Sequence, residues 1–355
     1  MRPSTMKAVR QYGPRDLRLE SVAFPPPPGE GEALLRITAV GICGSDLHNY
    51  LDGGIGDTRI VAPIIPGHEF AAVVEEVGPN ALDGEGHPLS PGRRVAVEPA
   101  FPCGRCEFCE RGDPNLCPHI RFCGHGSEQG ALSQFRCISS RNCFPVPDSL
   151  SDAEAMLLEP LGVALHSLNL AGLRLGESAA VLGAGPIGLF LLRLLRLQGV
   201  RPLMASEPLP WRAELARRYG ADAVIGGGQD AGREIRHLTG GRGVDVVFEA
   251  AWGGETVRQA VEMAAPGARI VLVGIPSDDC LTMKSSLVRR KGLTIVVVRR
   301  MKLTYPRAIA LAARMQPPIG EIARHTFPLE KVQEAFEANA AYRDEVVKVV
   351  IAPQD

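Results

Sequence analysis

The sequence has no excess of charge of either sign and few aromatic side chains. Its 355 residues carry 39 Lys plus Arg against 40 Asp plus Glu, and aromatic residues make up 5% of the chain. Without a basic excess, the net charge of the protein provides no attraction to phosphate backbones or anionic lipid. We therefore expect no nucleic acid and no membrane among its partners.

Long apolar runs, internal repeats and low-complexity segments are also absent. The longest apolar stretch, LFLLRLLRL at 189–197, is interrupted by arginine and is too short to span a bilayer. The opening residues, MRPSTMKAVR, have no apolar signal core. These features predict a cytoplasmic protein.

The length and the 45% hydrophobic content favour two domains, because one domain usually holds ~100–200 residues. From about residue 30 to 150, short β-like runs alternate with Gly- and Pro-rich turns, which predicts an all-β domain with long loops. A helical stretch follows at 152–172. Beyond it, strand-like and helix-like segments alternate regularly.

Six apolar runs in this second part have the length and composition of strands buried on both faces, as in a parallel doubly wound sheet. They lie at 178–184, 201–207, 223–226, 244–250, 268–274 and 293–298. The tail carries a helical segment at 330–340 and an apolar run at 346–352, which we expect to return to the first domain. The predicted boundaries are 1–160, 161–298 and 299–355.

Nine cysteines in a reducing compartment indicate metal chemistry rather than disulfides wherever their spacing is regular. Four of them form C-x2-C-x2-C-x7-C within the loop 101–118: Cys103, Cys106, Cys109 and Cys117. Four thiolates complete a tetrahedral zinc shell and leave no open position, so this site is predicted to be structural. Four unrelated thiols and a nucleic-acid zinc ribbon are the alternatives. The tight spacing disfavours the first, and the acidic residues of the loop disfavour the second.

A nucleotide-binding pattern follows the first of the six strands. In SAAVLGAGPIGLF, Gly183, Gly185 and Gly188 form G-x-G-x-x-G between a strand and a helix. Glycine permits the tight turn and the close approach of a pyrophosphate to the helix N-terminus. Glu207, at the end of the next strand, can accept hydrogen bonds from ribose hydroxyls and repel a 2′-phosphate, which favours NAD over NADP.

Three further segments carry side chains that zinc accepts: Cys43 in VGICGSDLH, His68 and Glu69 in PGHE, and Glu159 in LLEPLG. Taken singly, each is more often an ordinary residue, because a lone buried cysteine packs as a small hydrophobe and a lone histidine is usually a hydrogen-bonded core residue.

Taken together and in this order, GICGSD-x-H, GHE, the four-cysteine loop, EPL, GAGPIG and FPLEKVQEAFE resemble the zinc-containing medium-chain dehydrogenases. Within that family the chain is similar to the sorbitol (polyol) and threonine dehydrogenase branch, over essentially its whole length. The resemblance implies a GroES-like β-rich catalytic domain plus a Rossmann doubly wound six-stranded parallel sheet. It also implies two zinc ions per chain, NAD as the hydride acceptor, and a homo-oligomer, a dimer or tetramer, for which the apolar last strand LTIVVV is a suitable edge.

By this resemblance Cys43 and His68 bind the reactive zinc, and Glu69 and Glu159 share the remaining protein coordination; which glutamate is bound at rest stays open. Zinc shifts the pKa of an oxygen that it binds from ~16 towards ~7, which prepares an alcohol to release hydride. Ser45 and His48 match positions that contact the substrate hydroxyl and pass its proton to solvent. A turn-capping serine and a surface histidine are the ordinary alternatives.

The resemblance also assigns cofactor and substrate positions. The predicted cofactor residues are Gly183, Gly185, Pro186, Ile187, Gly188, Glu207, Arg212, Val273, Gly274 and Val298. The predicted substrate residues are Ser45, Asn49, Phe122, Glu159, Arg299 and Arg300. Several of these residues also have an ordinary explanation without a ligand: Ile187 and Val273 could be core residues, and Arg212 and Arg300 could be solvated surface residues.

The substrate positions depart from the polyol branch. Val298, Arg299 and Arg300 stand where that branch has Phe-Arg-Tyr, Asn49 replaces a tyrosine, and His125 stands where a smaller polar residue is usual. A neutral polyol is the first expected substrate, a phosphorylated or acidic polyol or an amino-cyclitol comes next, and L-threonine is third. A non-catalytic NAD-binding protein and a zinc-free quinone reductase are the other classes. The complete set of zinc-ligand residues disfavours both.

Overall fold

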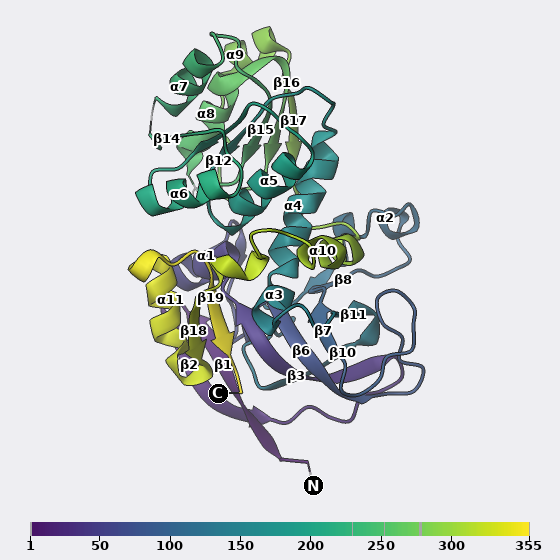
Figure 1. Cartoon of the computed structure of the whole chain (residues 1–355). Helices are drawn as coiled ribbons and strands as arrows, with labels where there is room; N and C mark the ends of the chain where they lie inside the picture. The colour runs from purple at the N-terminus through teal and green to yellow at the C-terminus, as the bar shows by residue number, and fades with distance from the viewer. Residues whose placement is uncertain (1, 229, 252, 277–278, 355) are drawn as a thin grey trace. The chain divides into compact units, whose positions relative to one another are not determined.

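The computed structural model describes residues 2–228, 230–251, 253–276 and 279–354 (Figure 1). The chain divides into two compact units: unit 1 comprises Met1–Glu159 and Tyr305–Asp355, and unit 2 comprises Pro160–Thr304. Among the described residues, no helix has the length and apolar character needed to cross a membrane.

A seven-stranded sheet forms the core of unit 1, in the order β11-β7-β6-β3-β19-β18, with β10 also pairing with β3. Its strands are β3 (Glu32–Gly41), β6 (Glu69–Val77), β7 (Arg94–Val97), β10 (Phe135–Ser139), β11 (Cys143–Pro145), β18 (His325–Pro328) and β19 (Val349–Ala352). β19, from the end of the chain, pairs antiparallel with β3 so that Val350 lies opposite Gly41. At the same end of β3, Gly41 lies opposite Glu69, the first residue of β6.

Smaller elements surround this sheet. The remaining strands of unit 1 pair as β1 (Thr5–Gly13) with β2 (Asp16–Ala23), β4 (Gly54–Ile55) with β5 (Thr58–Arg59), and β8 (Ala100–Phe101) with β9 (Arg121–Phe122). The helices of unit 1 are α1 (Gly44–Asp52), α2 (Glu107–Glu110), α3 (Asp152–Met156), α10 (Tyr305–Ala312) and α11 (Val332–Ala340), and the 3-10 turns are Pro114–Leu116, Ser140–Asn142, Ile319–Ile322, Leu329–Lys331 and Arg343–Glu345.

The helical stretch expected at 152–172 is interrupted in the structure. It consists of α3 and α4 (Leu158–Ala171), with Leu157 between them. Pro160 explains the break, because proline has no N–H to donate to the carbonyl of Met156 and its ring clashes there, whereas it is tolerated in the first turn of a helix. Glu159 is thereby placed in the first turn of α4.

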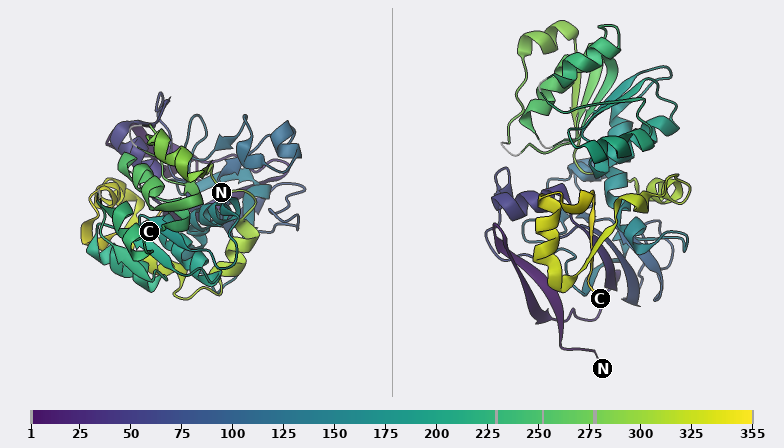
Figure 2. Two further views of the ribbon diagram at one scale, coloured as in Figure 1. Left: turned by 90° about the horizontal axis from the view of Figure 1, so that it is seen from above. Right: turned by 60° about the vertical axis from the view of Figure 1, so that its left-hand side comes forward.

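Unit 2 is built on a six-stranded parallel sheet, which confirms the predicted doubly wound fold (Figures 1 and 2). The strand order is β14-β13-β12-β15-β16-β17, with β12 (Ala179–Leu182), β13 (Leu203–Ser206), β14 (Ala223–Ile225), β15 (Val244–Glu249), β16 (Ala264–Leu272) and β17 (Thr294–Val297). The connecting helices are α5 (Pro186–Leu197), α6 (Pro210–Arg218), α7 (Ala231–Leu238), α8 (Gly254–Met263) and α9 (Ser285–Lys291). Because the order reverses at β12, ligands are expected at the carboxyl ends of β12 and its neighbours.

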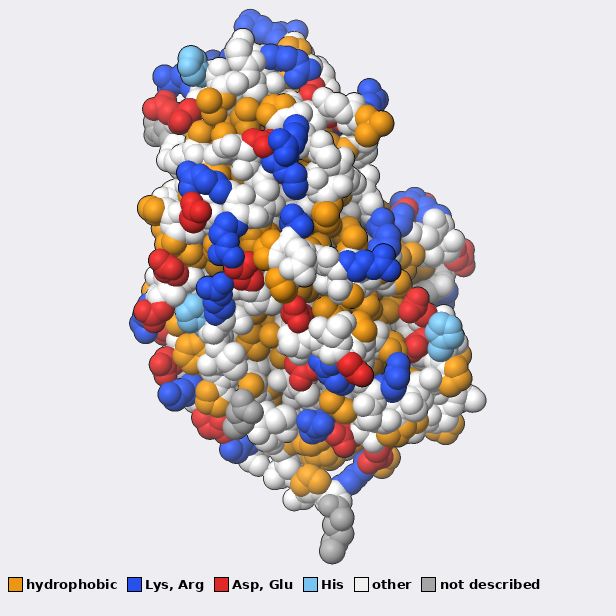
Figure 3. All heavy atoms as spheres, in the orientation of Figure 1, with side chains coloured by type: hydrophobic (Ala, Val, Ile, Leu, Met, Phe, Trp, Pro, Cys, Tyr) orange, Lys and Arg blue, Asp and Glu red, His pale blue; other side chains and the backbone are white. Residues whose placement is uncertain are grey.

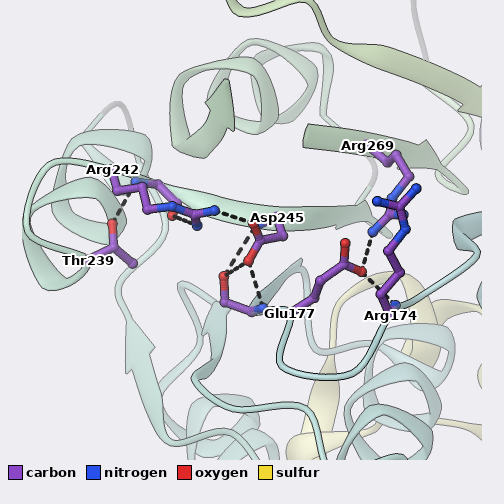
Figure 4. A network of polar contacts seen from close by, with 8 residues as sticks. Arg174, Glu177, Thr239, Arg242, Asp245 and Arg269 are labelled. Atoms are coloured by element: carbon purple, nitrogen blue, oxygen red, sulfur yellow. Dashed lines mark hydrogen bonds and ion pairs between the residues drawn. The ribbon is translucent and has the colours of Figure 1, made fainter. Parts of the chain in front are cut away.

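Charged side chains cover the amino ends of these strands (Figure 4). Asp245 accepts hydrogen bonds from the N–H and hydroxyl of Ser178, at 2.9 and 2.7 Å, and pairs with Arg242. Burial raises the pKa of Asp245, but these hydrogen bonds outweigh it and lower the pKa to about 2. Glu177 pairs with Arg269 beside this group. Arg242 and Arg269 each have an acidic partner, so we interpret this end of the sheet as structural.

Candidate active site

Strand pairing brings three of the four predicted ligands of the reactive zinc together in unit 1. Cys43 directly precedes α1, two residues after β3 ends, and His68 and Glu69 lie where β6 begins. Since Gly41 and Glu69 are opposite one another, the two segments meet at one edge of the sheet. One ligand atom each from Cys43, His68 and Glu69 lie within 4.8 Å of one another, and His68 and Glu69 are buried.

Asp46 is a part of this site that the sequence reasoning did not single out. Its Oδ1 lies 3.4 Å from Nδ1 of His68, and its Oδ2 accepts a hydrogen bond of 3.0 Å from the N–H of Cys43. Burial alone lowers the pKa of His68, but Asp46 and Cys43 outweigh it and raise that pKa well above its usual value. A carboxylate behind a histidine fixes the ring and makes its other nitrogen a better metal ligand. The signal was present in GICGSD, three residues after Cys43.

Glu159 lies close to this set, although it is not one of the three residues that share the 4.8 Å spacing. Burial, together with the neighbouring Glu69 carboxylate, raises the pKa of Glu159 to about 7 against the opposing effects of His68 and Lys348. Two buried carboxylates next to one thiol therefore repel each other, and a dication would relieve that repulsion.

Lys348 is the second residue that the sequence reasoning missed. Its Nζ donates to Oε1 and Oε2 of Glu69 at 2.8 and 2.6 Å, and to the carbonyl oxygen of Ile42 at 3.0 Å. Burial lowers the pKa of Lys348, but Glu69 and Cys43 outweigh it and raise that pKa. The run VVKVVIA reads as a plain strand, and nothing local in it connects Lys348 to a residue of β6.

The relay candidates lie on α1, next to the same set. Ser45 Oγ is 3.4 Å from Nε2 of His68, and His48 is buried with Nδ1 3.3 Å from Oδ2 of Asp52. Asn49 is buried too, and its carbonyl oxygen accepts a 2.8 Å hydrogen bond from Gln11. A hydroxyl and an imidazole one turn apart on a helix suit a proton path.

Two aromatic rings, those of Phe122 and His125, pack against His68. The ring centroids of His68 and Phe122 are 5.2 Å apart, and His125 lies 5.3 Å from each of them. Nδ1 of His125 is 3.2 Å from the carbonyl oxygen of Cys123. The rings of Phe122, a predicted substrate residue, and of His125 therefore both lie against that of His68.

The four loop cysteines also come together. Their sulfur atoms lie within 4.8 Å of one another, and Cys106 Sγ is 3.5 Å from Cys109 Sγ. Zinc–sulfur bonds of ~2.3 Å in a tetrahedron place the sulfurs about 3.8 Å apart, so the cluster fits a zinc ion closely. The backbone N–H of Arg105 helps to lower the pKa of Cys103 to about 6, which favours the thiolate that zinc binds.

In unit 2, the glycine pattern forms the turn between β12 and α5. Gly183 has φ +89°, a conformation that favours glycine, and Gly185 is the N-cap of α5, followed by Pro186. A Cβ on Gly188 would lie 1.9 Å from the carbonyl oxygen of Gly183, so only glycine fits there. The free N–H groups at the start of α5 suit an anion such as pyrophosphate.

Glu207 and Arg212 adjoin this turn. Glu207 accepts hydrogen bonds from the N–H of Ala184 at 2.8 Å and of Leu209 at 3.0 Å, so its carboxylate is fixed at the carboxyl end of β13. The guanidinium of Arg212 lies 5.0 Å from the Trp211 ring centroid, and its Nη1 is 4.0 Å from the Cβ position of Gly185. Both side chains can therefore reach a dinucleotide on this turn.

The remaining cofactor and substrate candidates lie near the same edge of the sheet of unit 2 or in the helix that follows the turn. Ile187 is partly buried in α5, and the N–H groups of Val273 and Gly274 donate to the carbonyl oxygen of Glu249. A Cβ on Gly274 would lie 2.0 Å from the carbonyl oxygen of Ala251, so the backbone is close-packed there. Val298, Arg299 and Arg300 follow β17; Arg299 is exposed, and Arg300 is partly buried with φ +56°.

Comparison with known proteins finds a family match in each of the two units. Residues 29–148 match the model of the alcohol dehydrogenase GroES-like domain, and residues 186–314 match that of the zinc-binding dehydrogenases. Sorbitol dehydrogenase of Bacillus subtilis is 34% identical over 352 residues, which cover 99% of this chain and 98% of the relative.

Solved structures give the same result. An Escherichia coli oxidoreductase of unknown specificity superposes with a TM-score of 0.90 at 29% identity, covering 98% of this chain and 99% of the other. An Escherichia coli alcohol dehydrogenase in complex with NADH has a TM-score of 0.86 at 27% identity, covering 99% and 100%. The chain therefore belongs to the zinc-containing medium-chain alcohol dehydrogenases, in the sorbitol dehydrogenase branch, and is an oxidoreductase whose cofactors are zinc and NAD.

Proposed function

We propose that this protein oxidises a secondary alcohol of the polyol type to a ketone and transfers the hydride to NAD. The observation that carries the proposal is the meeting of a thiol, an imidazole and a carboxylate within 4.8 Å, with a second carboxylate, Glu159, close by. This mixed donor set fits zinc, whose reactive sites in proteins hold three protein ligands and keep one position open.

In this proposal Cys43 and His68 hold the reactive zinc together with Glu69, and Glu159 is the carboxylate available for exchange. The four loop cysteines hold a second zinc with a structural role. When bound, the reactive zinc supplies Lewis acidity that lowers the pKa of a substrate hydroxyl, and NAD supplies the hydride acceptor.

The protein's own residues supply orientation and a route for the proton. Asp46 keeps the ring of His68 in the orientation in which Nε2 points to Ser45. Ser45 accepts the hydroxyl proton on its Oγ as it gives up its own, and His48 passes a proton on towards solvent. Asp52, half-exposed and 3.3 Å from His48, marks the exit of this route.

Unit 2 is the NAD-binding domain in this proposal, and unit 1 is the catalytic domain. The turn Gly183–Gly188 takes the pyrophosphate, with Pro186 and Ile187 on the helix beneath it. Glu207 accepts hydrogen bonds from the adenosine ribose, and Arg212 contacts the cofactor from α6. Val273, Gly274 and Val298 adjoin the nicotinamide half.

A neutral polyol remains the first candidate substrate, because several known relatives are sorbitol dehydrogenases. Arg299 and Arg300, with His125 and Asn49, give a more polar and more cationic set of side chains than the polyol branch usually has. This favours a phosphorylated or acidic polyol as the second candidate, since arginine pairs well with phosphate and carboxylate. An amino-cyclitol and L-threonine follow.

A screen of NAD reduction tests the proposal. Neutral polyols, their phosphates and 3-hydroxy amino acids are offered to the zinc-loaded protein, with and without a zinc chelator. Chelator-sensitive oxidation of at least one polyol is expected. If Arg300→Ala slows neutral and phosphorylated polyols equally, Arg300 has no role in charge pairing; if no secondary alcohol is oxidised, the proposed reaction is wrong.

We also infer a homo-oligomer and a cytoplasmic location. β17 ends the six-stranded sheet, and Val297 on it is exposed, so this edge suits pairing with a second copy across a two-fold axis. All nine cysteines are free thiols, which suits a reducing compartment. In Figure 3, basic and acidic side chains are interspersed over the part of this face that belongs to unit 1.

A further inference from the structure

Lys348 is a buried cation that no step of the proposed reaction uses. Its side chain is 3% exposed, and that of Glu69 is 1% exposed. The ammonium group contacts the segments that carry the proposed ligands: it donates twice to the carboxylate of Glu69 and once to the carbonyl of Ile42, next to Cys43. The three hydrogen atoms of a lysine ammonium group match these three contacts.

The backbone explains why a residue so far along the chain reaches this place. Lys348 directly precedes β19, which pairs with the same end of β3 that leads to Cys43, and the N–H of Ile42 donates to the carbonyl of Val349 at 3.3 Å. Glu69 belongs to β6, which pairs with β3 on the opposite side from β19. The side chain of Lys348 therefore links the start of β6 to the end of β3.

The acidic groups around His68 explain why a buried cation is favourable here. Glu69, Glu159, Asp46 and the thiolate form of Cys43 are acidic groups packed around His68, and like charges in a buried site repel one another. An ammonium group among them offsets part of that repulsion and fixes the direction of one carboxylate. An ionised carboxylate has about four lone-pair positions, so a Glu69 held by Lys348 still has others to offer.

We propose that Lys348 is a positioning residue of the reactive metal set: it fixes Glu69 relative to Cys43, so that the ligands are already assembled when a metal ion arrives. The proposal rests on the proposed function, in which these residues hold zinc. It also gives the C-terminal return of the chain a role in metal binding. Loss of the ammonium group frees Glu69 to turn, and the metal is then held less firmly.

Metal release from the full-length protein tests this inference. The reactive site is loaded with Co²⁺, its absorption spectrum is recorded, and release to a chelator is timed for the wild type, Lys348→Met and Lys348→Arg. Partners behind metal ligands typically change affinity by ~10–100-fold. We expect Lys348→Met to release the metal at least ~10-fold faster with an altered spectrum, and Lys348→Arg, which keeps charge and donors, to recover most of the difference.

Two controls make the result specific. Lys291→Met removes a different, partly buried lysine, whose Nζ donates to the carbonyls of Val261, Glu262 and Ala264 in unit 2. This variant should leave the spectrum and the rate of metal release unchanged. In a Glu69→Gln background, Lys348→Met should add less than ~2-fold to the release rate, because coupled residues are not additive. If Lys348→Met does not fold, Lys348→Gln, which keeps a donor without the charge, replaces it with the same expectation.

The inference is overturned if a folded Lys348 variant keeps the wild-type spectrum and release rate, or if its effect is undiminished in the Glu69→Gln background. A different result would show that the proposed function itself is wrong: the wild-type protein would bind no Co²⁺ at Cys43 and His68.

Discussion

The two proposed zinc sites of unit 1, the loop set of four cysteines and the reactive set of Cys43, His68 and Glu69, are built in opposite ways. The loop set takes four thiolates from one short segment, Cys103–Cys117, held by turns and by the four-residue helix α2. The reactive set takes unlike ligands from the ends of β3 and β6, is buried in the sheet edge, and has Asp46 and Lys348 behind it. A site built from one segment depends on its turns, whereas a site built across a sheet depends on strand register and on neighbouring charges.

The largest effect that separates the two sets is expected for Cys43→Ala. The loss of a ligand from the reactive set should lower kcat/KM at least ~10³-fold, about 4 kcal/mol in the barrier. Zinc analysis should fall from two ions per chain to one, while the melting temperature changes little. An active variant that keeps both ions would remove Cys43 from the reactive set.

Cys109→Ser should act in the opposite manner, because it breaks the loop set. We expect loss of the zinc of the loop set and a decrease in melting temperature of roughly 5–10 °C, since loss of a structural metal is among the larger single-residue effects. The fraction that stays folded should keep kcat/KM within ~10-fold. A full loss of activity in folded, reactive-zinc-loaded protein would show that the loop takes part in catalysis.

Asp46→Asn tests whether the buried set depends on a residue that is not a ligand. Loss of the negative charge behind His68 should weaken metal retention by ~10–100-fold, measured as release to a chelator. Asp83→Asn is the matched control, because Asp83 is also buried but accepts from the N–H groups of Glu85 and His87 in a turn. Equal metal loss in both variants would mean that general destabilisation is the cause.

The smallest predicted effect compares two glycines that each follow a ligand cysteine. Gly104 has φ +73° and no atom within 4 Å of an added Cβ, so Gly104→Ala should cost about 1 kcal/mol of stability through backbone strain alone. Gly44 begins α1 and has equally open space, so Gly44→Ala should be neutral or slightly stabilising. Equal melting temperatures for the two variants would contradict the dependence of the loop on its turns.

The same contrast explains what could be predicted from the sequence. The four-cysteine loop and the turn Gly183–Gly188 were predictable because spacing within one segment fixes their geometry. The six parallel strands were predictable because buried strands are uniformly apolar. Cys43, His68 and Glu159 were predicted as ligands only through the order of motifs, since each of them alone is ordinary.

Asp46 and Lys348 were not assigned roles, and the reason is physical. Asp46 lies on α1 and contacts His68 at the start of β6, and Lys348 contacts Glu69 because β19 pairs with β3. Register between distant strands is not visible in a single sequence. The break at Leu157, by contrast, follows from Pro160 and could have been read from the sequence.

Anomalous diffraction at the zinc absorption edge, from crystals of the zinc-loaded protein, tests the central claim most directly. We predict two peaks per chain, one among Cys43, His68 and a glutamate, and one among the four loop cysteines. The absence of the first peak in zinc-loaded, active protein would contradict the account.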